Sequence, residues 1–159
     1  MMKKLVKEEG AVVGLPLYIL ITVVVAAVAL AAVLSFMVTS GPSINSWQIY
    51  ISNGSSGSFN LTKVIKAHTD TTGEAKWSGQ VKIVIEDQNG HPLPNVKVVL
   101  DGCGVTEAGQ TDSNGTAVIT LNDVTLPSGV QQDQIQVKMQ YPGLIGEQTK
   151  TDTITVIRG

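Results

Sequence analysis

The sequence predicts an α+β protein in which one long apolar helix is followed by an antiparallel β-sandwich. Residues 11–38 are apolar on nearly every side of a helix. No Asp, Glu, Lys or Arg occurs between Glu9 and Lys63, although both flanks carry such residues freely. After residue 44, short runs alternate apolar and polar side chains and are separated by turn residues, as half-buried strands do.

The composition excludes several classes of function. The chain has 159 residues and a formal net charge of −2, which suits one domain plus the N-terminal run. Acids and bases are mixed after residue 62, so no basic surface for nucleic acid is expected. Cys103 is the single cysteine, and His68 and His91 are the only histidines. They offer little material for a disulfide framework, a metal cluster or a catalytic triad. We therefore expect no enzyme activity and no cofactor.

Residues 11–38 form the first expected element. A helix of that length is roughly 40 Å long and exceeds the ~30 Å hydrocarbon core of a bilayer. Lys3, Lys4 and Lys7 precede it, and no basic residue follows until Lys63. The positive-inside rule therefore places the N-terminus in the cytoplasm and residues 43–159 outside the cell.

Two ordinary interpretations of this helix are a secretory signal and a permanent membrane anchor. A secretory signal has an apolar region of about 7–15 residues and a small-residue cleavage site at its far end. The run here is much longer, although AVALAA at Ala27–Ala32 could supply such a site. A single-pass anchor accounts for the length and the orientation. It does not account for KEEG at Lys7–Gly10, directly before Ala11.

This KEEG segment, followed by a small residue and an unbroken apolar run, resembles the class III signal of type IV pilins. It is most similar to that of archaeal pilins and archaellins, over roughly the first 38 residues. The resemblance implies that a prepilin peptidase removes the leader, residues 1–10, by cutting between Gly10 and Ala11. Residues 11–38 are then kept. Many bacterial pilins have a glutamate five residues after the cut, where this chain has Leu15; archaeal relatives commonly lack that acid.

The run also suits close packing between copies of the helix. Helix association in lipid depends on close backbone approach, which small residues permit, and β-branched residues add a stiff surface. Pro16 costs about 3 kcal/mol or more inside a helix. We expect it to kink the uncut helix or to set its start near Leu15, and to be nearly harmless close to a new N-terminus at Ala11. The residues expected in a filament core are Val23, Ala26, Ala27, Ala29, Leu30, Ala31, Val33 and Leu34.

The remaining chain is expected to be a β-domain. A hinge at residues 39–43, TSGPS, should end the helix, and residues 44–159 follow as strands. Strands are predicted at 47–51, 81–85, 96–100, 117–121, 135–141 and 154–156. Turns are predicted at DQNG (87–90), DSNG (112–115), LPSG (126–129) and YPG (141–143). Six or seven such strands indicate an antiparallel sandwich.

Two segments of this domain carry a second resemblance. VKIVIEDQNGHPLPNVKVVLDG (81–102), followed by TDSNGTAVITL (111–121), resembles immunoglobulin (Ig)-like domains of the invasin type and the related carboxypeptidase-regulatory-like sandwiches. The resemblance spans residues 80–156. It implies an Ig-like β-sandwich, a fold that serves mainly as a spacer, a stalk or an adhesive module. The segment from Ser43 to His68 lies outside it and is expected to add a strand or to pair with a neighbouring subunit.

Three N-glycosylation sequons follow the helix, at Asn53 (NGS), Asn60 (NLT) and Asn114 (NGT). Two of them lie in the uncharged stretch ISNGSSGSFNLT, where glycans would keep the surface soluble. The alternatives for this stretch are a polar uncharged loop or a subunit contact.

Two further features have ordinary explanations. Cys103 is expected to be a buried thiol, although a lone cysteine in an exported chain can also pair between molecules. DSNG at Asp112–Gly115 resembles the start of a calcium loop, but the later acidic positions are missing, so a turn is expected.

Together these features predict a structural subunit of an extracellular type IV pilus-like filament. The precursor is inserted in the membrane with its N-terminus in the cytoplasm, and the mature form lies in a filament at the cell surface. Its partners would be copies of itself, the membrane before assembly, and the prepilin peptidase and secretion machinery, with no nucleic acid indicated. The alternative is a monomeric, membrane-anchored surface domain whose Ig-like module binds a ligand or acts as a spacer. A third hypothesis is a secreted module whose helix is removed.

Overall fold

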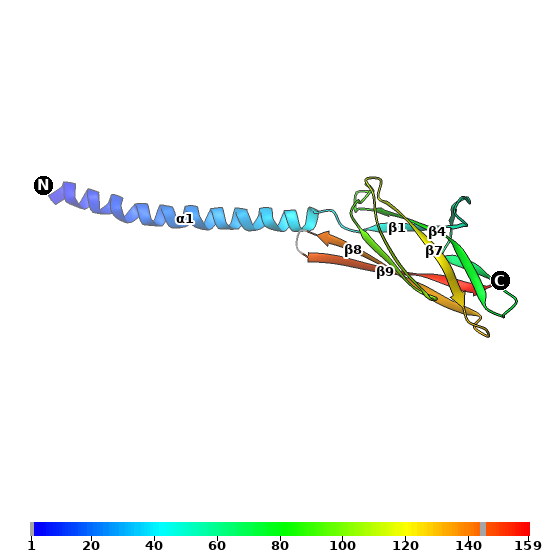
Figure 1. The fold of residues 1–159 in the computed structure, drawn as a ribbon. Coiled ribbons are helices and arrows are strands. Elements are labelled where there is room, and N and C mark those ends of the chain that lie inside the picture. The colour runs from blue at the N-terminus through cyan, green and yellow to red at the C-terminus, as the bar shows by residue number, and fades with distance from the viewer. Residues whose placement is uncertain (1, 144–145) are drawn as a thin grey trace. The chain divides into compact units, whose positions relative to one another are not determined.

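The computed structural model describes residues 2–143 and 146–159 (Figure 1). The chain divides into two compact units, the first ending at Gly41 and the second formed by Pro42–Gly159. We call the second unit the sheet domain. The prediction of an apolar helix followed by a large, mostly antiparallel β-structure is confirmed.

The first unit is one helix, α1 (Met2–Ser40), 39 residues long. It runs through Pro16, so the expectation that the helix would start near Leu15 is wrong. Proline has no N–H, and the carbonyl of Val12, four residues earlier, therefore loses its helical donor. At its other end α1 reaches Ser40, two residues beyond the expected end at Val38.

The sheet domain is built from nine strands within the described residues. They are β1 (Ser46–Asn53), β2 (Asn60–Leu61), β3 (Val64–Thr69), β4 (Ala75–Glu86), β5 (Lys97–Gly102), β6 (Val105–Gln110), β7 (Thr116–Leu126), β8 (Gln132–Gly143) and β9 (Gly146–Arg158). The segment between Ser43 and His68 indeed adds strands, namely β1, β2 and most of β3.

The strands form two sheets joined by β3. Sheet A contains β2, β1, β4 and β7 in that order, and sheet B contains β9, β8, β5 and β6. Val64–Ala67 of β3 pair with β9, whereas His68 and Thr69 pair with β4. The β3–β9 pairing is parallel, which corrects the expectation of a wholly antiparallel structure. A tight turn into β4 fixes the direction of β3, and β9 runs in that same direction.

Both sheets bury one face in a common apolar core. Side chains alternate between buried and more exposed positions along β4 and β8, as the pleat of a strand requires. Because the core draws on both sheets, their apolar faces cover each other. The largest fully buried side chains are Ile49, Ile65, Ile83, Ile85, Leu93, Leu100, Leu121, Leu126, Ile135, Met139, Ile154 and Val81.

One predicted turn is wrong. Tyr141, Pro142 and Gly143 belong to strand β8 and pair with residues of β9, down to Gly143 opposite Gly146. Pro142 is tolerated there because the pairing of β5 with β8 ends at Gln140, so no neighbour on that side needs the missing N–H.

The expected hinge at 39–43 is also shorter than predicted. Ser43 donates from its backbone N–H to the Gln88 side-chain oxygen at 3.1 Å. Ile44 donates to the Gln148 side-chain oxygen at 3.2 Å and is 3% exposed in the core. Asn45 donates to the Glu86 carbonyl at 3.1 Å. The chain is therefore attached to the sheet domain from Ser43 onward.

A polar contact at Asp152 of β9 binds side chains from two other segments of the sheet domain. The Trp47 indole N–H donates to Asp152 Oδ2 at 2.7 Å, and the Lys63 ammonium binds the same oxygen. Burial raises the pKa of Asp152, but the hydrogen bonds from Lys63 and Trp47 outweigh burial and leave this pKa below its usual value. The contact joins a strand of sheet A to a strand of sheet B.

The core predicts unequal effects for two adjacent residues of β7. Ile119 is 4% exposed and Val118 is 51% exposed. Ile119→Ala should lower the free energy of unfolding by about 2–5 kcal/mol, because it removes core contacts and leaves a cavity. Val118→Thr should change it by less than about 0.5 kcal/mol. Urea unfolding of both variants is the measurement, and similar losses would contradict the assigned faces.

The Asp152 contact predicts a dependence of stability on pH. The folded-state pKa of Asp152 lies below the unfolded value of about 3.9, so its stabilisation is present above about pH 4 and is lost as the pH falls further. Asp152→Asn should lower the unfolding free energy at pH 7 by about 1–3 kcal/mol and flatten its fall in acid. Chemical denaturation from pH 7 to pH 2 tests this, with Glu107→Gln, an exposed change on β6, as the control. An unchanged acid slope in Asp152→Asn would sink the assignment.

Candidate functional site

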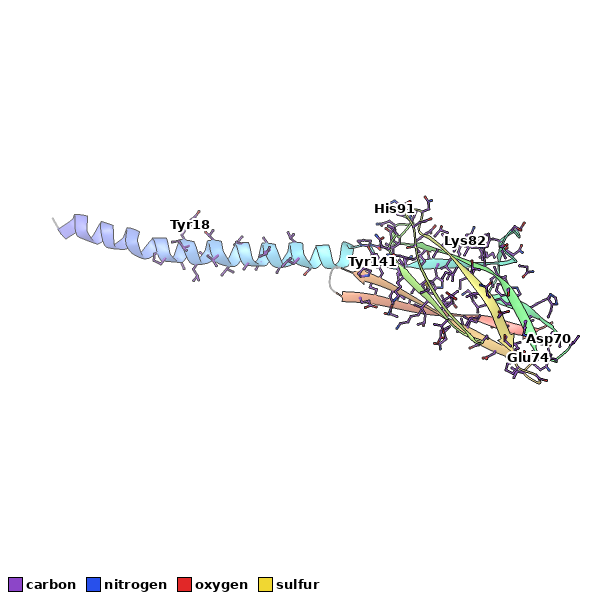
Figure 2. The ribbon with its side chains drawn as sticks, in the orientation of Figure 1. Tyr18, Asp70, Glu74, Lys82, His91 and Tyr141 are labelled. Carbon is purple, nitrogen blue, oxygen red and sulfur yellow. The ribbon has the colours of Figure 1, made fainter. Side chains whose placement is uncertain are left out.

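The apolar surface of α1 is the main candidate site. Side chains are described for residues 16–35, and every one of them is exposed (Figure 2). The segment Pro16–Ser35 has a mean hydropathy of 2.9 and is long and apolar enough to cross a membrane. A signal sequence near the N-terminus meets the same criteria of length and composition. This unit therefore presents an apolar cylinder that its own residues do not cover.

The residues predicted for a filament core all lie on this cylinder. Val23, Leu30, Val33 and Leu34 are each more than half exposed. The four alanines among them, Ala26, Ala27, Ala29 and Ala31, are exposed as well. They are distributed around the helix, so the structure supplies contact surface on several sides at once.

The hydroxyl of Thr22 is compatible with an apolar environment. Its Oγ1 donates to the carbonyl of Tyr18, one turn earlier, at 2.9 Å. Such a bond satisfies the hydroxyl inside the helix and lowers the cost of placing it in lipid or in a protein interior.

The predicted cleavage position lies inside α1. The backbone of Gly10 and Ala11 is helical, and the structure gives no description of the side chain of Ala11. A peptidase that cuts an extended strand would have to unwind this turn first. Gly10, Gly14 and Pro16 are the residues with the lowest helix propensity in the neighbourhood, so unwinding costs least there.

The three sequons lie at the surface. Asn53 ends β1, and its side-chain oxygen accepts from the Trp77 indole N–H at 2.7 Å, which leaves the amide nitrogen out of that bond. Asn60 lies on β2. Asn53, Asn60 and Thr62 all line one groove of about 200 Å³. Asn114 lies apart from them, in the turn before β7. The first two sequons therefore share one surface.

The acidic turns use their carboxylates internally. Asp112 Oδ1 accepts from the backbone N–H of Asn114 at 2.9 Å and of Thr116 at 3.1 Å. DSNG is therefore a turn, as predicted. Asp87 plays the same part in DQNG, accepting from Asn89 and His91. Among the residues that the structure describes, no group of three or more His, Cys, Asp or Glu could hold a metal ion.

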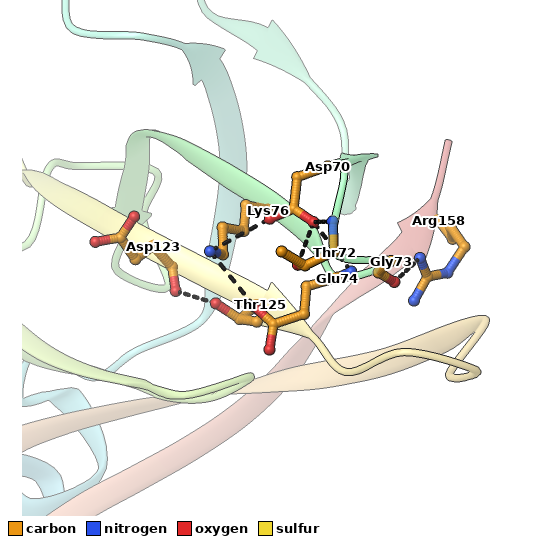
Figure 3. Close-up of polar contacts among 8 residues, drawn as sticks. All are labelled: Asp70, Thr72, Gly73, Glu74, Lys76, Asp123, Thr125 and Arg158. Atoms are coloured by element: carbon orange, nitrogen blue, oxygen red, sulfur yellow. Dashed lines mark hydrogen bonds and ion pairs between the residues drawn. The ribbon is translucent and has the colours of Figure 1, made fainter.

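A third turn of this kind, between β3 and β4, was not predicted (Figure 3). Asp70 Oδ1 accepts from the Thr72 hydroxyl and from the Thr72 backbone N–H, the latter at 2.8 Å. Lys76 lies 3.4 Å from a carboxylate oxygen of both Asp70 and Glu74. The bonds from Thr72, helped by Lys76, lower the pKa of Asp70 to about 2. This turn stabilises the reversal of the chain from β3 into β4.

Arg158 joins the same end of the sheet domain to its C-terminal strand. Its guanidinium donates to the carbonyls of Val130 (3.0 Å), Pro127 (2.7 Å) and Gly73 (2.8 Å) and to the Thr69 hydroxyl (3.2 Å). The planar fork of arginine suits several fixed acceptors at once. No local sequence pattern predicts this set, because its acceptors come from two segments, 69–73 and 127–130, that lie far from Arg158 in the chain.

Cys103 is buried in the hairpin between β5 and β6, as expected. It is 8% exposed, and with Gly104 it forms a two-residue turn with φ values of +52° and +80°. Positive φ at both positions is typical of the type I′ turns that join twisted strands. Burial, with Asp133 nearby, raises the pKa of the thiol to about 11. The thiol is therefore poorly placed for pairing between molecules.

The outer face of sheet A carries one cluster that sequence analysis missed. The Lys82 ammonium lies 4.8 Å from the ring centres of both Tyr50 and Phe59 (Figure 2 labels Lys82). Leu61 and Val118 occupy the same cross-strand row, through the pairs Tyr50–Leu61, Tyr50–Lys82 and Lys82–Val118. Along β1 and β4, buried and more exposed side chains alternate, and these residues lie on the face opposite the core. The same alternation in the sequence could have predicted this cluster.

The division into two units predicts that the sheet domain folds without the helix. A fragment of residues 42–159 should unfold cooperatively and remain monomeric in buffer, because its core is complete. The full chain should require detergent or lipid, because α1 is uncovered. Thermal unfolding and light scattering of both forms are the measurements. A fragment that aggregates as readily as the full chain would contradict this.

A comparison of the chain with protein-family models, with curated proteins and with solved structures gives no match.

Proposed function

We propose that the protein is a structural subunit of an extracellular, type IV pilus-like filament whose core is made by copies of α1. The observation that carries the proposal is the uncovered apolar surface of residues 16–35. Between these residues, twelve large apolar or aromatic side chains are more than half exposed: Leu17, Tyr18, Ile19, Leu20, Ile21, Val23, Val24, Val25, Val28, Leu30, Val33 and Leu34.

The size of this surface requires a partner. Burying one large apolar side chain is worth about 1.5–3 kcal/mol, so covering this set is worth on the order of tens of kcal/mol. Lipid supplies that cover while the precursor is in the membrane. Other copies of the helix supply equivalent apolar contacts in a filament, and the alanines permit the close approach that such packing needs.

Removal of the leader favours the transfer of α1 from lipid into a filament, because it removes charged residues from the end of the helix. The leader holds every charge that precedes the apolar run, namely Lys3, Lys4, Lys7, Glu8 and Glu9. A cut between Gly10 and Ala11 leaves a helix that begins with apolar residues and makes Pro16 its sixth residue, so that any helix lost to the proline is confined to a short end. The secretion machinery would then extract the mature subunit from the bilayer.

We propose further that the sheet domain is an Ig-like sandwich that covers the outside of the filament. The strand order supports this. If β3, β4, β5, β7, β8 and β9 are given the Ig letters A, B, C, E, F and G, the neighbours A–B–E and G–F–C match those of the Ig fold. β1 and β2 are then an addition that pairs with strand B.

The second candidate is a monomeric surface domain anchored by an uncut α1. The observation that favours it is the length of α1, which suffices for one membrane crossing, together with a sheet domain that forms a complete unit. In this case the outer face of sheet A, or the groove at Asn53 and Asn60, would be a binding or spacing surface.

The N-terminus of the mature protein distinguishes the candidates. Filament assembly predicts a first residue of Ala11, an anchor predicts an uncut leader, and secretion predicts a start beyond Ala29. Gly10→Val should block cutting and filament formation, because a branched side chain replaces the small residue before the scissile bond. Gly14→Val, four residues later, is the matched control and should still be cut. The readouts are N-terminal sequencing and electron microscopy of sheared surface material. Normal filaments from Gly10→Val would rule the cleavage out.

A further inference from the structure

The apolar run is too long for the bilayer, which raises the question of which part lies in lipid. The helix from Ala11 to Val38 is roughly 42 Å long, against a hydrocarbon thickness of ~30 Å. Fitting all of it would need a tilt of about 45°, beyond the ~40° that helices show. One end of the run therefore lies outside the hydrocarbon.

Tyr18 marks the end that stays outside. Its side chain is 70% exposed and projects a phenol from a helix that is otherwise apolar around it (Figure 2). A phenol is favourable at the membrane–water interface, where its ring lies among lipid and its hydroxyl meets water or headgroups. Thr22, one turn further on, does not need to lie at the interface, because its hydroxyl already donates a hydrogen bond to the Tyr18 carbonyl.

Pro16 gives the second, independent indication. Because α1 continues through Pro16, the carbonyl of Val12 has no helical donor. An unsatisfied carbonyl is unfavourable in hydrocarbon but is readily satisfied by water or headgroups. The helix before Tyr18 is therefore the part suited to the interface.

The far end of the helix agrees with this boundary. Counting from Ile19, about twenty residues span ~30 Å and end at Val38. Thr39, Ser40 and Gly41 follow there, so the polar residues begin where the hydrocarbon ends. The opposite choice, a span of residues 11–30, would leave Val33, Leu34 and Phe36 in water.

We infer that Tyr18 sets the cytoplasmic boundary of the membrane-inserted precursor, with residues 19–38 in hydrocarbon and residues 11–17 in the headgroup layer. This rests on the proposed function, which supplies the orientation of the helix. The bond between Gly10 and Ala11 then lies about 12 Å on the cytoplasmic side of the boundary. It is open to a peptidase that works at the membrane surface, and the weak turn around Gly14 and Pro16 can unwind in contact with water.

Accessibility of single cysteines tests the boundary. Val13→Cys, Ile21→Cys and Val33→Cys are each made in a Cys103→Ser, Gly10→Val background, so that one uncut species with one thiol is present. Membrane vesicles of both orientations are treated with a membrane-impermeant maleimide. Labelling of Val13→Cys from the cytoplasmic side, with Ile21→Cys and Val33→Cys protected on both sides, is the expected result.

Two other patterns overturn the inference and are distinguishable. Protection of Val13→Cys with labelling of Val33→Cys from outside would place the span at residues 11–30, and the proposed function would stand. Labelling of both Ile21→Cys and Val33→Cys would show that the helix is not in the membrane, which overturns both proposals.

The role of Tyr18 itself has a separate readout. Tyr18→Leu should draw residues 11–17 toward the lipid and slow the labelling of Val13→Cys, whereas Tyr18→Trp, another interfacial aromatic residue, should preserve it. Equal labelling of Val13→Cys in the Tyr18→Leu variant and in its parent would remove Tyr18 as the boundary residue.

Discussion

The apolar surface of α1 is the constraint on which the rest of the molecule depends. A helix whose side chains are apolar on every side cannot stay in water, and within its own unit nothing covers residues 16–35. This surface therefore needs a cover from outside its own unit, such as lipid, unless the segment is removed as a signal sequence. The sheet domain is under the opposite requirement, because it has to be complete without help from the helix. Its core, drawn from both sheets, meets that requirement.

The sheet domain is held together by the contacts of its C-terminal strand. β9, the last strand, lies between β3 and β8, so the two sheets are joined only when the C-terminal segment is in place. Arg158 then fixes the end of β9 to loops at 73 and 127–130, and Asp152 fixes its middle to Trp47 of β1. Near the bulge at Trp77 and Gly79, a side chain at position 79 would lie 2.2 Å from the Ser52 carbonyl and 2.4 Å from the Trp77 ring, so only glycine permits this approach.

Sequence reasoning recovered the elements that bury one face. β1, β4, β5, β7, β8 and β9 contain alternating apolar residues, and each was predicted at least in part. β6 was missed because it lies at an edge and none of its residues is fully buried. β3 was missed because it buries only Ile65 and Ala67, too few for a clear period. The exposed helix was predictable, since an apolar run without periodicity has no polar side to turn toward water. The contacts of Arg158 and Asp152 could not be predicted from the sequence, because they join residues far apart in the chain.

The absence of charge between Glu9 and Lys63 has two physical causes rather than one. Up to Val38 it follows from the apolar helix, where a charge would be costly in lipid or in a helical core. From Ile44 to Leu61 the chain belongs to the sheet domain, and it contributes Ile44, Ile49 and Ile51 to the core. The loop at 54–58 is exposed and gains its solubility from serine hydroxyls and the glycine backbone. The gap alone therefore overstates the region that avoids water: its first part is the exposed apolar helix, and its second part belongs to the sheet domain.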